Sequence, residues 1–165
     1  MKPALLVIDI QNAWLDGHQG LRESVEKRAN VINEAIEIFR GKRLPIIVVY
    51  HEDKKDGPRP GTKAFEFSPT INIRDTDTKV TKNYPNAFNK TDLGNILRKK
   101  GCDTVIITGL SAVGCSLATY HGAIDLDLNP YFVRDGVAAD TEEHVRFAED
   151  ICDTLSVREF DRTLR

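Results

Sequence analysis

The most informative stretch of the sequence is Thr104-Val-Ile-Ile-Thr-Gly-Leu-Ser-Ala-Val-Gly-Cys-Ser-Leu-Ala-Thr-Tyr-His-Gly-Ala123. It begins with a short β-branched run at 105–107, a pattern that indicates a strand buried on both faces. Small and polar residues then interrupt the run, and from Val113 apolar side chains recur at the spacing of a helix. The stretch therefore predicts a strand, a tight turn and a helix, with Cys115 in the first turn of that helix.

Cys115 is a candidate nucleophile because of this position. The positive end of a helix dipole and the unpaired N–H groups there stabilise a thiolate, which is the nucleophilic form of cysteine. An inert, packed cysteine stays open as the alternative, since free cysteine is among the most buried residue types. The stretch is not a G-x-S-x-G nucleophile elbow, because position 113 is Val. It is not a dinucleotide-binding fingerprint either, because Ser111 replaces the second glycine.

Composition narrows the class of protein. A chain of 165 residues fits one domain, expected to span 1–165. The net charge is −2, and no basic stripe suggests nucleic acid. No apolar run approaches the roughly 18 residues that span a bilayer, and Asp9 interrupts the N-terminal apolar segment, so we expect no membrane contact and no signal peptide. Three cysteines without C-x-x-C spacing argue against disulfides or a zinc knuckle and favour a reducing, cytoplasmic compartment.

Apolar runs and helical periodicities alternate along the chain. Strands are expected at 4–9, 45–50, 78–82, 105–107, 129–134 and 155–160, and helices at 21–40, at 91–100, from 113 onward and at 141–152. Residues 11–20 and 51–75 are rich in turn formers and are expected to be loops. This order predicts an α/β fold of three α/β/α layers, Rossmann-like, around a six-stranded, mostly parallel sheet.

Three chemically useful side chains fall at or just past the carboxyl ends of strands: Asp9, Lys82 and Cys115. Alone, Asp9 could cap a turn and Lys82 could be a solvated lysine. Together they lie at the edge where such sheets bind ligands, and so they predict a site.

The loop after the second strand offers His51, Glu52 and Asp53 as possible metal ligands. Contiguous side chains diverge on an extended chain, so we expect a solvated loop and no metal. In the same loop, Phe65 and Phe67 could cover the site as a lid or fill a subunit contact.

Four segments of the sequence resemble the isochorismatase-like cysteine hydrolases, the superfamily of nicotinamidases and N-carbamoylsarcosine amidase. They are Leu5-Leu-Val-Ile-Asp-Ile-Gln-Asn12, Thr81-Lys-Asn-Tyr-Pro-Asn-Ala-Phe88, Gly109-Leu-Ser-Ala-Val-Gly-Cys115 with Ala118, Thr119 and Ala123 after it, and Arg134-Asp135. The resemblance covers essentially the whole chain, in the same order and spacing.

The resemblance implies a Cys–Asp–Lys triad, with Cys115 as nucleophile, Asp9 as general base and Lys82 holding the carboxylate and thiolate. It also implies a cis peptide bond between Leu110 and Ser111, and an oxyanion hole formed by the backbone N–H groups of Ser111 and Cys115. Such an enzyme would hydrolyse a small amide or related C–N bond through a thioester, with no cofactor.

The resemblance further implies a homo-oligomer of two or more subunits. We expect the substrate pocket to include residues of the matched segments and of the loop between them, namely Gln11, Trp14, Tyr84 and Phe88.

Two departures leave the substrate open. The segment Tyr50-His-Glu-Asp-Lys-Lys55 lacks the Asp and His pattern of nicotinamidases, and isochorismatases themselves lack the Cys that stands here at 115. The alternative hypotheses are a non-catalytic member that binds a small ligand or a partner protein, and a redox thiol protein in which Cys115 is oxidised.

Overall fold

The computed structural model describes residues 1–164. Its strands and helices are, in chain order, β1 Pro3–Ile8, α1 Asn12–Leu15, α2 Gln19–Gly41, β2 Ile46–His51, β3 Thr78–Lys82, α3 Leu93–Lys99, β4 Thr104–Leu110, α4 Cys115–Ile124, β5 Asn129–Ala138, α5 Glu142–Ile151, β6 Thr154–Leu155 and α6 Val157–Thr163. Within this part of the chain, no helix combines the length and the apolar character needed to cross a membrane.

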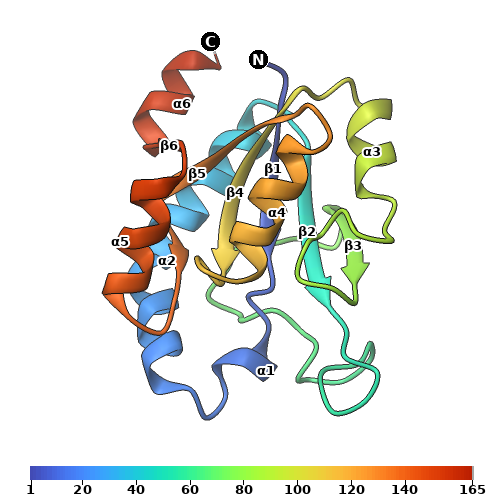
Figure 1. Ribbon diagram of the computed structural model, residues 1–165, viewed down its shortest axis with the longest axis vertical. Coiled ribbons are helices and arrows are strands. Elements are labelled where there is room, and N and C mark those ends of the chain that lie inside the picture. Colours follow the sequence, from blue (N-terminus) through green and yellow to red (C-terminus); the bar gives the residue numbers. More distant parts are fainter. Residues whose placement is uncertain (165) are drawn as a thin grey trace.

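The six strands form one sheet in the order β3-β2-β1-β4-β5-β6, and every neighbouring pair is parallel. The carboxyl ends of β1, β2, β3 and β4 therefore share one edge, at the bottom of Figure 1. The central strands β1 and β4 are buried along their whole length, as their continuous apolar runs predict. The strand order changes direction between β1 and β4, which is where open α/β sheets bind ligands.

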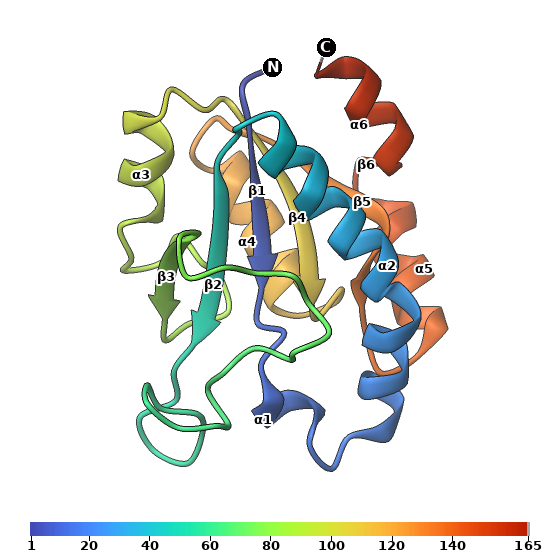
Figure 2. The ribbon, with the colours of Figure 1, turned by 180° about the vertical axis from the view of Figure 1, so that it is seen from behind.

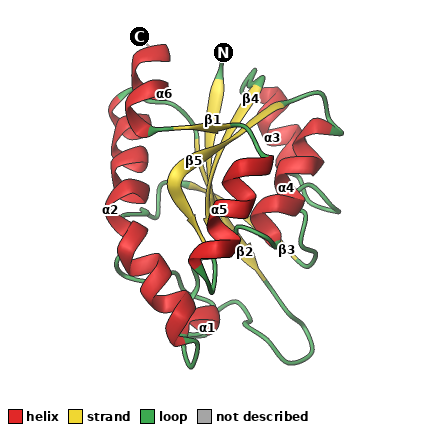
Figure 3. Cartoon of the chain, turned by 60° about the vertical axis from the view of Figure 1, so that its left-hand side comes forward, coloured by secondary structure: helices red, strands yellow, loops and turns green. Residues whose placement is uncertain are grey.

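Helices cover both faces of the sheet (Figure 3), so the predicted three-layer α/β/α fold is confirmed. Helices α3, α4 and α5 lie over one face (Figure 1), and α2 and α6 lie over the other (Figure 2). Successive residues of a strand point to opposite faces. Accordingly, Leu6 and Ile8 of β1 pack in the first core, whereas Leu5 and Val7 pack in the second.

The structure corrects the sequence-based prediction at two elements. The short helix α1 lies within the predicted loop 11–20. The predicted edge strand at 155–160 is wrong, because strand β6 ends at Leu155 and helix α6 follows. The reason is local: Ser156 and Glu159 form a capping box, in which each side chain bonds the other's backbone N–H and so starts a helix.

Candidate active site

Four neighbouring strands deliver side chains to one place at the carboxyl edge of the sheet. Asp9 follows β1, His51 ends β2, Lys82 ends β3, and Cys115 starts α4 after β4. The Nζ atom of Lys82 lies 2.8 Å from Oδ2 of Asp9 and 3.2 Å from Sγ of Cys115. The structure thus brings together the three residues that the sequence places at strand ends, and their roles in catalysis stay a prediction.

Asp9 lies where the chain leaves the sheet. Its φ of 55° is in the left-handed region, which Asp adopts more readily than most residues. Its carboxylate is buried, and among the described residues Oδ1 has no hydrogen-bond partner. Burial raises the pKa of the Asp9 carboxyl, while the Lys82 ammonium opposes the change. Asp9 is therefore a stronger base than an exposed aspartate and has one oxygen free to take a proton.

The protonation state of Cys115 differs from the sequence-based prediction, which favours a thiolate in the resting site. Burial and the nearby Asp9 carboxylate raise the pKa of Cys115 to about 11, and the Lys82 ammonium offsets only part of this. The physical reason is that desolvation and a neighbouring anion disfavour a second negative charge more than the helix start favours it. In the resting site Cys115 is protonated at neutral pH, so it needs a base to become a nucleophile.

Lys82 joins the other three side chains. It is fully buried, and its Nζ also lies 2.8 Å from Nδ1 of His51. An ammonium group has three hydrogens, and here three acceptors surround it: Asp9, Cys115 and His51. Such pairing is what allows a charged lysine to be buried at all.

His51 is the residue of this cluster that the sequence analysis did not place in the site. Burial and the Lys82 ammonium both lower the pKa of His51, so its ring is neutral at pH 7. Its backbone is held by Gln11, whose amide donates to the His51 carbonyl at 3.0 Å and accepts from the His51 N–H at 2.8 Å. One feature of the sequence could have placed His51 in the site: it directly follows the buried run 46–50. It therefore ends β2, which lies between β1 and β3 in the sheet.

A pocket of about 240 Å³ opens above the thiol. Its lining is largely apolar and consists of Asp9, Trp14, Leu21, His51, Leu110, Ser111, Gly114 and Cys115.

Of the four residues expected in this pocket, Trp14 lines it, and the other three lie elsewhere. The Gln11 side chain ties His51 to the carbonyl of Phe65. Tyr84 is exposed and stacks under the Lys90 ammonium, and Phe88 packs against the core.

The turn between β4 and α4 is organised around the carbonyl of Ser111. This oxygen accepts from the N–H groups of Gly114 at 2.9 Å and Ser116 at 3.1 Å. Within residues 1–164, the backbone N–H groups of Ser111 and Cys115 donate to no protein acceptor. Both donors are therefore unpaired among the described residues, and their role as an oxyanion hole stays a prediction.

The expected cis bond between Leu110 and Ser111 is not found, since every described peptide bond is trans. The trans form is favoured by about 3–4 kcal/mol for a non-proline residue. The chain beyond the bond is held in place by the Ala112 N–H, which donates to the Ala138 carbonyl at 2.7 Å.

The cluster is poorly suited to a metal ion. Asp9, His51 and Cys115 offer ligand atoms within 4.8 Å of one another. However, the Lys82 ammonium contacts all three of these residues and would repel a metal cation. Asp53, also considered from the sequence, turns to its own loop and accepts from the Lys55 N–H at 2.9 Å.

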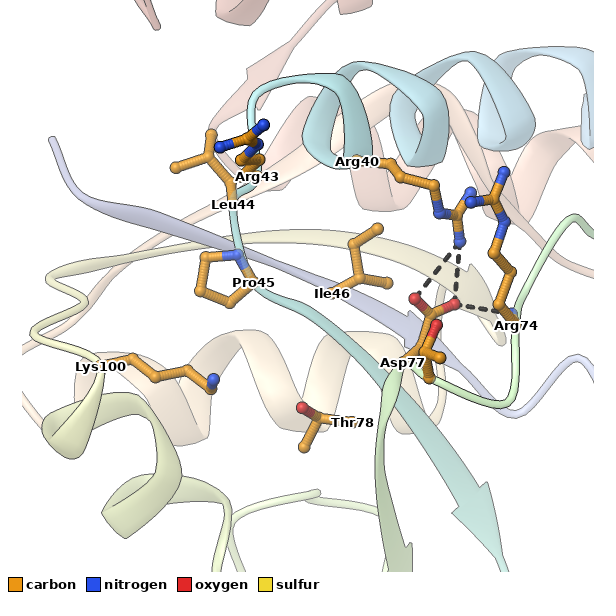
Figure 4. A pocket seen from close by; sticks show the side chains of 10 residues that line it. Arg40, Arg43, Leu44, Pro45, Ile46, Arg74, Asp77, Thr78 and Lys100 are labelled. Carbon is orange, nitrogen blue, oxygen red and sulfur yellow. Dashed lines mark hydrogen bonds and ion pairs between the residues drawn. The ribbon is translucent and has the colours of Figure 1, made fainter.

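A second pocket, of about 330 Å³, lies at the amino ends of β2 and β3 (Figure 4). Arg40, Arg43 and Lys100 contribute to its wall, and Asp77 accepts from Nη2 of Arg40 at 2.9 Å. It contains no cysteine or histidine and lies at the opposite ends of the strands from Cys115. The pocket above Cys115 is therefore the candidate active site.

Comparisons with known proteins agree with this architecture. The family model of the isochorismatase domain matches residues 3–151. The isochorismatase family protein YrdC of Bacillus subtilis is 29% identical over 140 residues, which cover 84% of this chain and 74% of that protein.

Two solved structures are similar over nearly the whole chain. An isochorismatase-like hydrolase from Alkaliphilus metalliredigens has a TM-score of 0.89 at 24% identity and covers 100% of both chains. N-carbamoylsarcosine amidase from Thermoplasma acidophilum has a TM-score of 0.84 at 27% identity, over 96% of this chain and 98% of its own.

Proposed function

This chain belongs to the isochorismatase family, and we propose that it is a cysteine hydrolase that cleaves the C–N bond of a small amide. The observation that carries the proposal is one buried ammonium, Lys82, in contact with a carboxylate and a thiol that both line a pocket. The similarity to N-carbamoylsarcosine amidase supports an amide substrate. The pocket volume of about 240 Å³ lies below the range of about 300–1,000 Å³ for drug-sized ligands, which favours a small one.

In the first step, the free oxygen of Asp9 takes the thiol proton as the sulfur of Cys115 attacks the amide carbon. A carbon–sulfur bond forms, and the π electrons of the carbonyl move to its oxygen. The N–H groups of Ser111 and Cys115 stabilise this oxyanion. The raised pKa of Asp9 suits this step, because a stronger base takes the thiol proton more readily.

In the second step, the electron pair returns from the oxyanion and the carbon–nitrogen bond breaks. The nitrogen leaves with the proton held by Asp9, and a thioester on Cys115 remains. Asp9 is then a carboxylate again, paired with Lys82.

In the third step, Asp9 takes a proton from water as the water oxygen attacks the thioester. The carbon–sulfur bond breaks, and the sulfur regains the proton from Asp9. The net reaction is amide plus water to carboxylic acid plus amine or ammonia, and Lys82 balances the negative charge of Asp9 and Cys115 throughout.

The test is ammonia release from a panel of small primary amides. We expect turnover of at least one amide, and loss of at least about 10³-fold in kcat for Cys115→Ala, since the nucleophile is removed. Asp9→Asn should lower kcat by about 10²–10⁴-fold, the usual contribution of a general base. Cys102→Ala is the matched control and should keep full activity, because Cys102 lies outside the pocket.

One observation favours a second candidate, a non-catalytic ligand-binding member of the family: the resting thiol has a pKa of about 11. This candidate predicts that amides raise the melting temperature without being hydrolysed. Mass spectrometry distinguishes the two, since only the hydrolase accumulates or turns over an acyl adduct on Cys115.

A further inference from the structure

The contacts of Lys82 fix the protonation of His51. A lysine ammonium can only donate hydrogen bonds, so Nδ1 of His51, 2.8 Å from Nζ, must be the acceptor. In a neutral imidazole the other nitrogen then carries the hydrogen. His51 is thus held in the tautomer with the proton on Nε2.

The ring of His51 is also fixed in place and faces the pocket. It lines the pocket beside Trp14, whose ring meets it edge-on with centroids 5.7 Å apart. Within the described chain, Nε2 donates to no protein group. Since Nδ1 is occupied by Lys82, the Nε2–H is a preoriented and unused donor in a largely apolar wall.

We propose that His51 is a substrate-binding residue whose Nε2–H donates to a second oxygen of the substrate, outside the scissile carbonyl. The inference rests on the proposed function and names its substrate class: a small amide with a neighbouring carbonyl oxygen. A neutral N–H donor suits an uncharged carbonyl, because the Lys82 ammonium is already shared by Asp9 and Cys115.

Two substitutions distinguish the role of Nδ1 from the role of Nε2 in His51. In His51→Asn, the amide oxygen takes the place of Nδ1 and accepts from Lys82, but no donor replaces Nε2–H. In His51→Gln, the longer amide places an N–H near the position of Nε2 and leaves Lys82 without its third acceptor. His144→Asn, on α5 and outside the lining of the pocket, is the matched control.

Binding is measured by calorimetry on the Cys115→Ala protein, which cannot form a thioester. The probes are 2-oxopropanamide and 2-methylpropanamide, in which a methyl group and a hydrogen replace the second oxygen. We expect 2-oxopropanamide to bind about tenfold more tightly, the value of one hydrogen bond of about 1.4 kcal/mol. His51→Asn should reduce this preference to about one, whereas His51→Gln and His144→Asn should keep it.

Equal binding of the two amides, no binding of 2-oxopropanamide, or an undiminished preference in a folded His51→Asn variant would each overturn the proposal. These outcomes do not depend on turnover, so they are distinguishable from a failure of the hydrolase proposal. In active protein, His51→Asn should raise KM for the oxoamide.

The tautomer has its own readout in nitrogen-15 NMR of histidine-labelled protein at pH 7. We expect one nitrogen of His51 to be pyridine-like and the other pyrrole-like, with the signals assigned by their loss in His51→Asn. In His51→Asn/Cys115→Ala the signals of the other histidines should not move. An imidazolium, or a proton on Nδ1, contradicts the proposal.

Discussion

Lys82 is the central residue of the site, because its buried ammonium contacts the side chains of Asp9, His51 and Cys115. In Lys82→Met, the similar volume is kept and the Asp9 carboxyl loses its counter-ion. Breaking a buried ion pair from one side costs about 3–5 kcal/mol, so we expect a fall of that size in the free energy of unfolding, measured in urea.

Lys79→Met is the matched control for this change, since Lys79 lies on the same strand but is exposed, with Asp75 at 3.5 Å. It should change the free energy of unfolding by less than about 0.5 kcal/mol. Equal effects of the two substitutions would mean that Asp9 is not charged in the folded protein.

The raised pKa of Cys115 predicts how the reactivity of its thiol depends on pH. Because the Asp9 carboxylate raises the pKa of Cys115, Asp9→Asn should lower that pKa from about 11 toward the usual value near 9. Burial, the larger cause, remains, so the shift should be partial. The measurement is the rate of iodoacetamide alkylation of Cys115 against pH, with adducts mapped by mass spectrometry.

Cys152 serves as the internal control, because its pKa is also raised to about 11, but by its own burial and by Asp153. Its alkylation profile should not move in Asp9→Asn. A Cys115 profile that stays in place as well would show that the carboxylate does not act on the sulfur.

At the level of single residues, the sequence points to Asp9, Lys82 and Cys115 because each lies at or just past the carboxyl end of a predicted strand. It does not identify the contact of His51 with Lys82. That contact depends on the register of two neighbouring strands, in which His51 of β2 is the direct partner of Lys82 of β3. Strand register is a property of the folded sheet and has no local signature in either segment.

Among the elements, the close approach of β1 and β4 depends on a glycine. Gly109 has a φ of 113°, and a Cβ atom there would collide with the backbone of Ile8, immediately before Asp9. Strain at such a φ costs about 1–3 kcal/mol and overpacking a similar amount. We therefore expect Gly109→Ala to lower the free energy of unfolding by at least about 2 kcal/mol in urea.

The matched control is Gly41→Ala, at the end of α2, where a Cβ atom would meet nothing within 4 Å. This substitution should be neutral or stabilise by up to about 1 kcal/mol, because alanine has less freedom in the unfolded chain. A tolerated Gly109→Ala would mean that β1 and β4 do not approach as closely as the structure has them.

Elements with a long, regular pattern are predicted well from the sequence, and short ones are not. The apolar stripe of α2 and the buried run of β4 are examples of the first kind. In the segment that forms α6, the alternation around Val157 favours a strand, but the capping box of Ser156 with Glu159 and the packing of Val157 and Phe160 on α2 produce a helix.

For the whole molecule, the sequence predicts the three layers and the parallel sheet, because alternating strands and helices allow few other arrangements. It does not reveal what covers the site. Phe65 and Phe67, expected as a lid or a subunit contact, pack on Tyr50 of β2, with ring centroids 4.9 and 4.8 Å away. A homo-oligomeric state stays a prediction.

Unfolding in urea tests whether the site and the rest of the domain unfold in one cooperative transition. Trp14 is the only tryptophan of the chain and lines the pocket, so its fluorescence reports on the site. Far-UV circular dichroism reports mainly on the helices of both faces. Because successive residues of β1 enter the two cores, one layer cannot lose its packing without the other. We therefore expect the two signals to give the same midpoint in urea.

A fluorescence transition that precedes the loss of helix would contradict this expectation. It would mean that α1 and the pocket wall open while the sheet persists, as a local unfolding event. The control is the double variant Trp14→Phe/Phe147→Trp, which moves the only tryptophan to an exposed position of α5, outside the lining of the pocket. If the midpoint of the tryptophan at position 147 coincides with that of circular dichroism and the midpoint of Trp14 does not, the local unfolding is confined to the site. The rest of the domain then unfolds cooperatively.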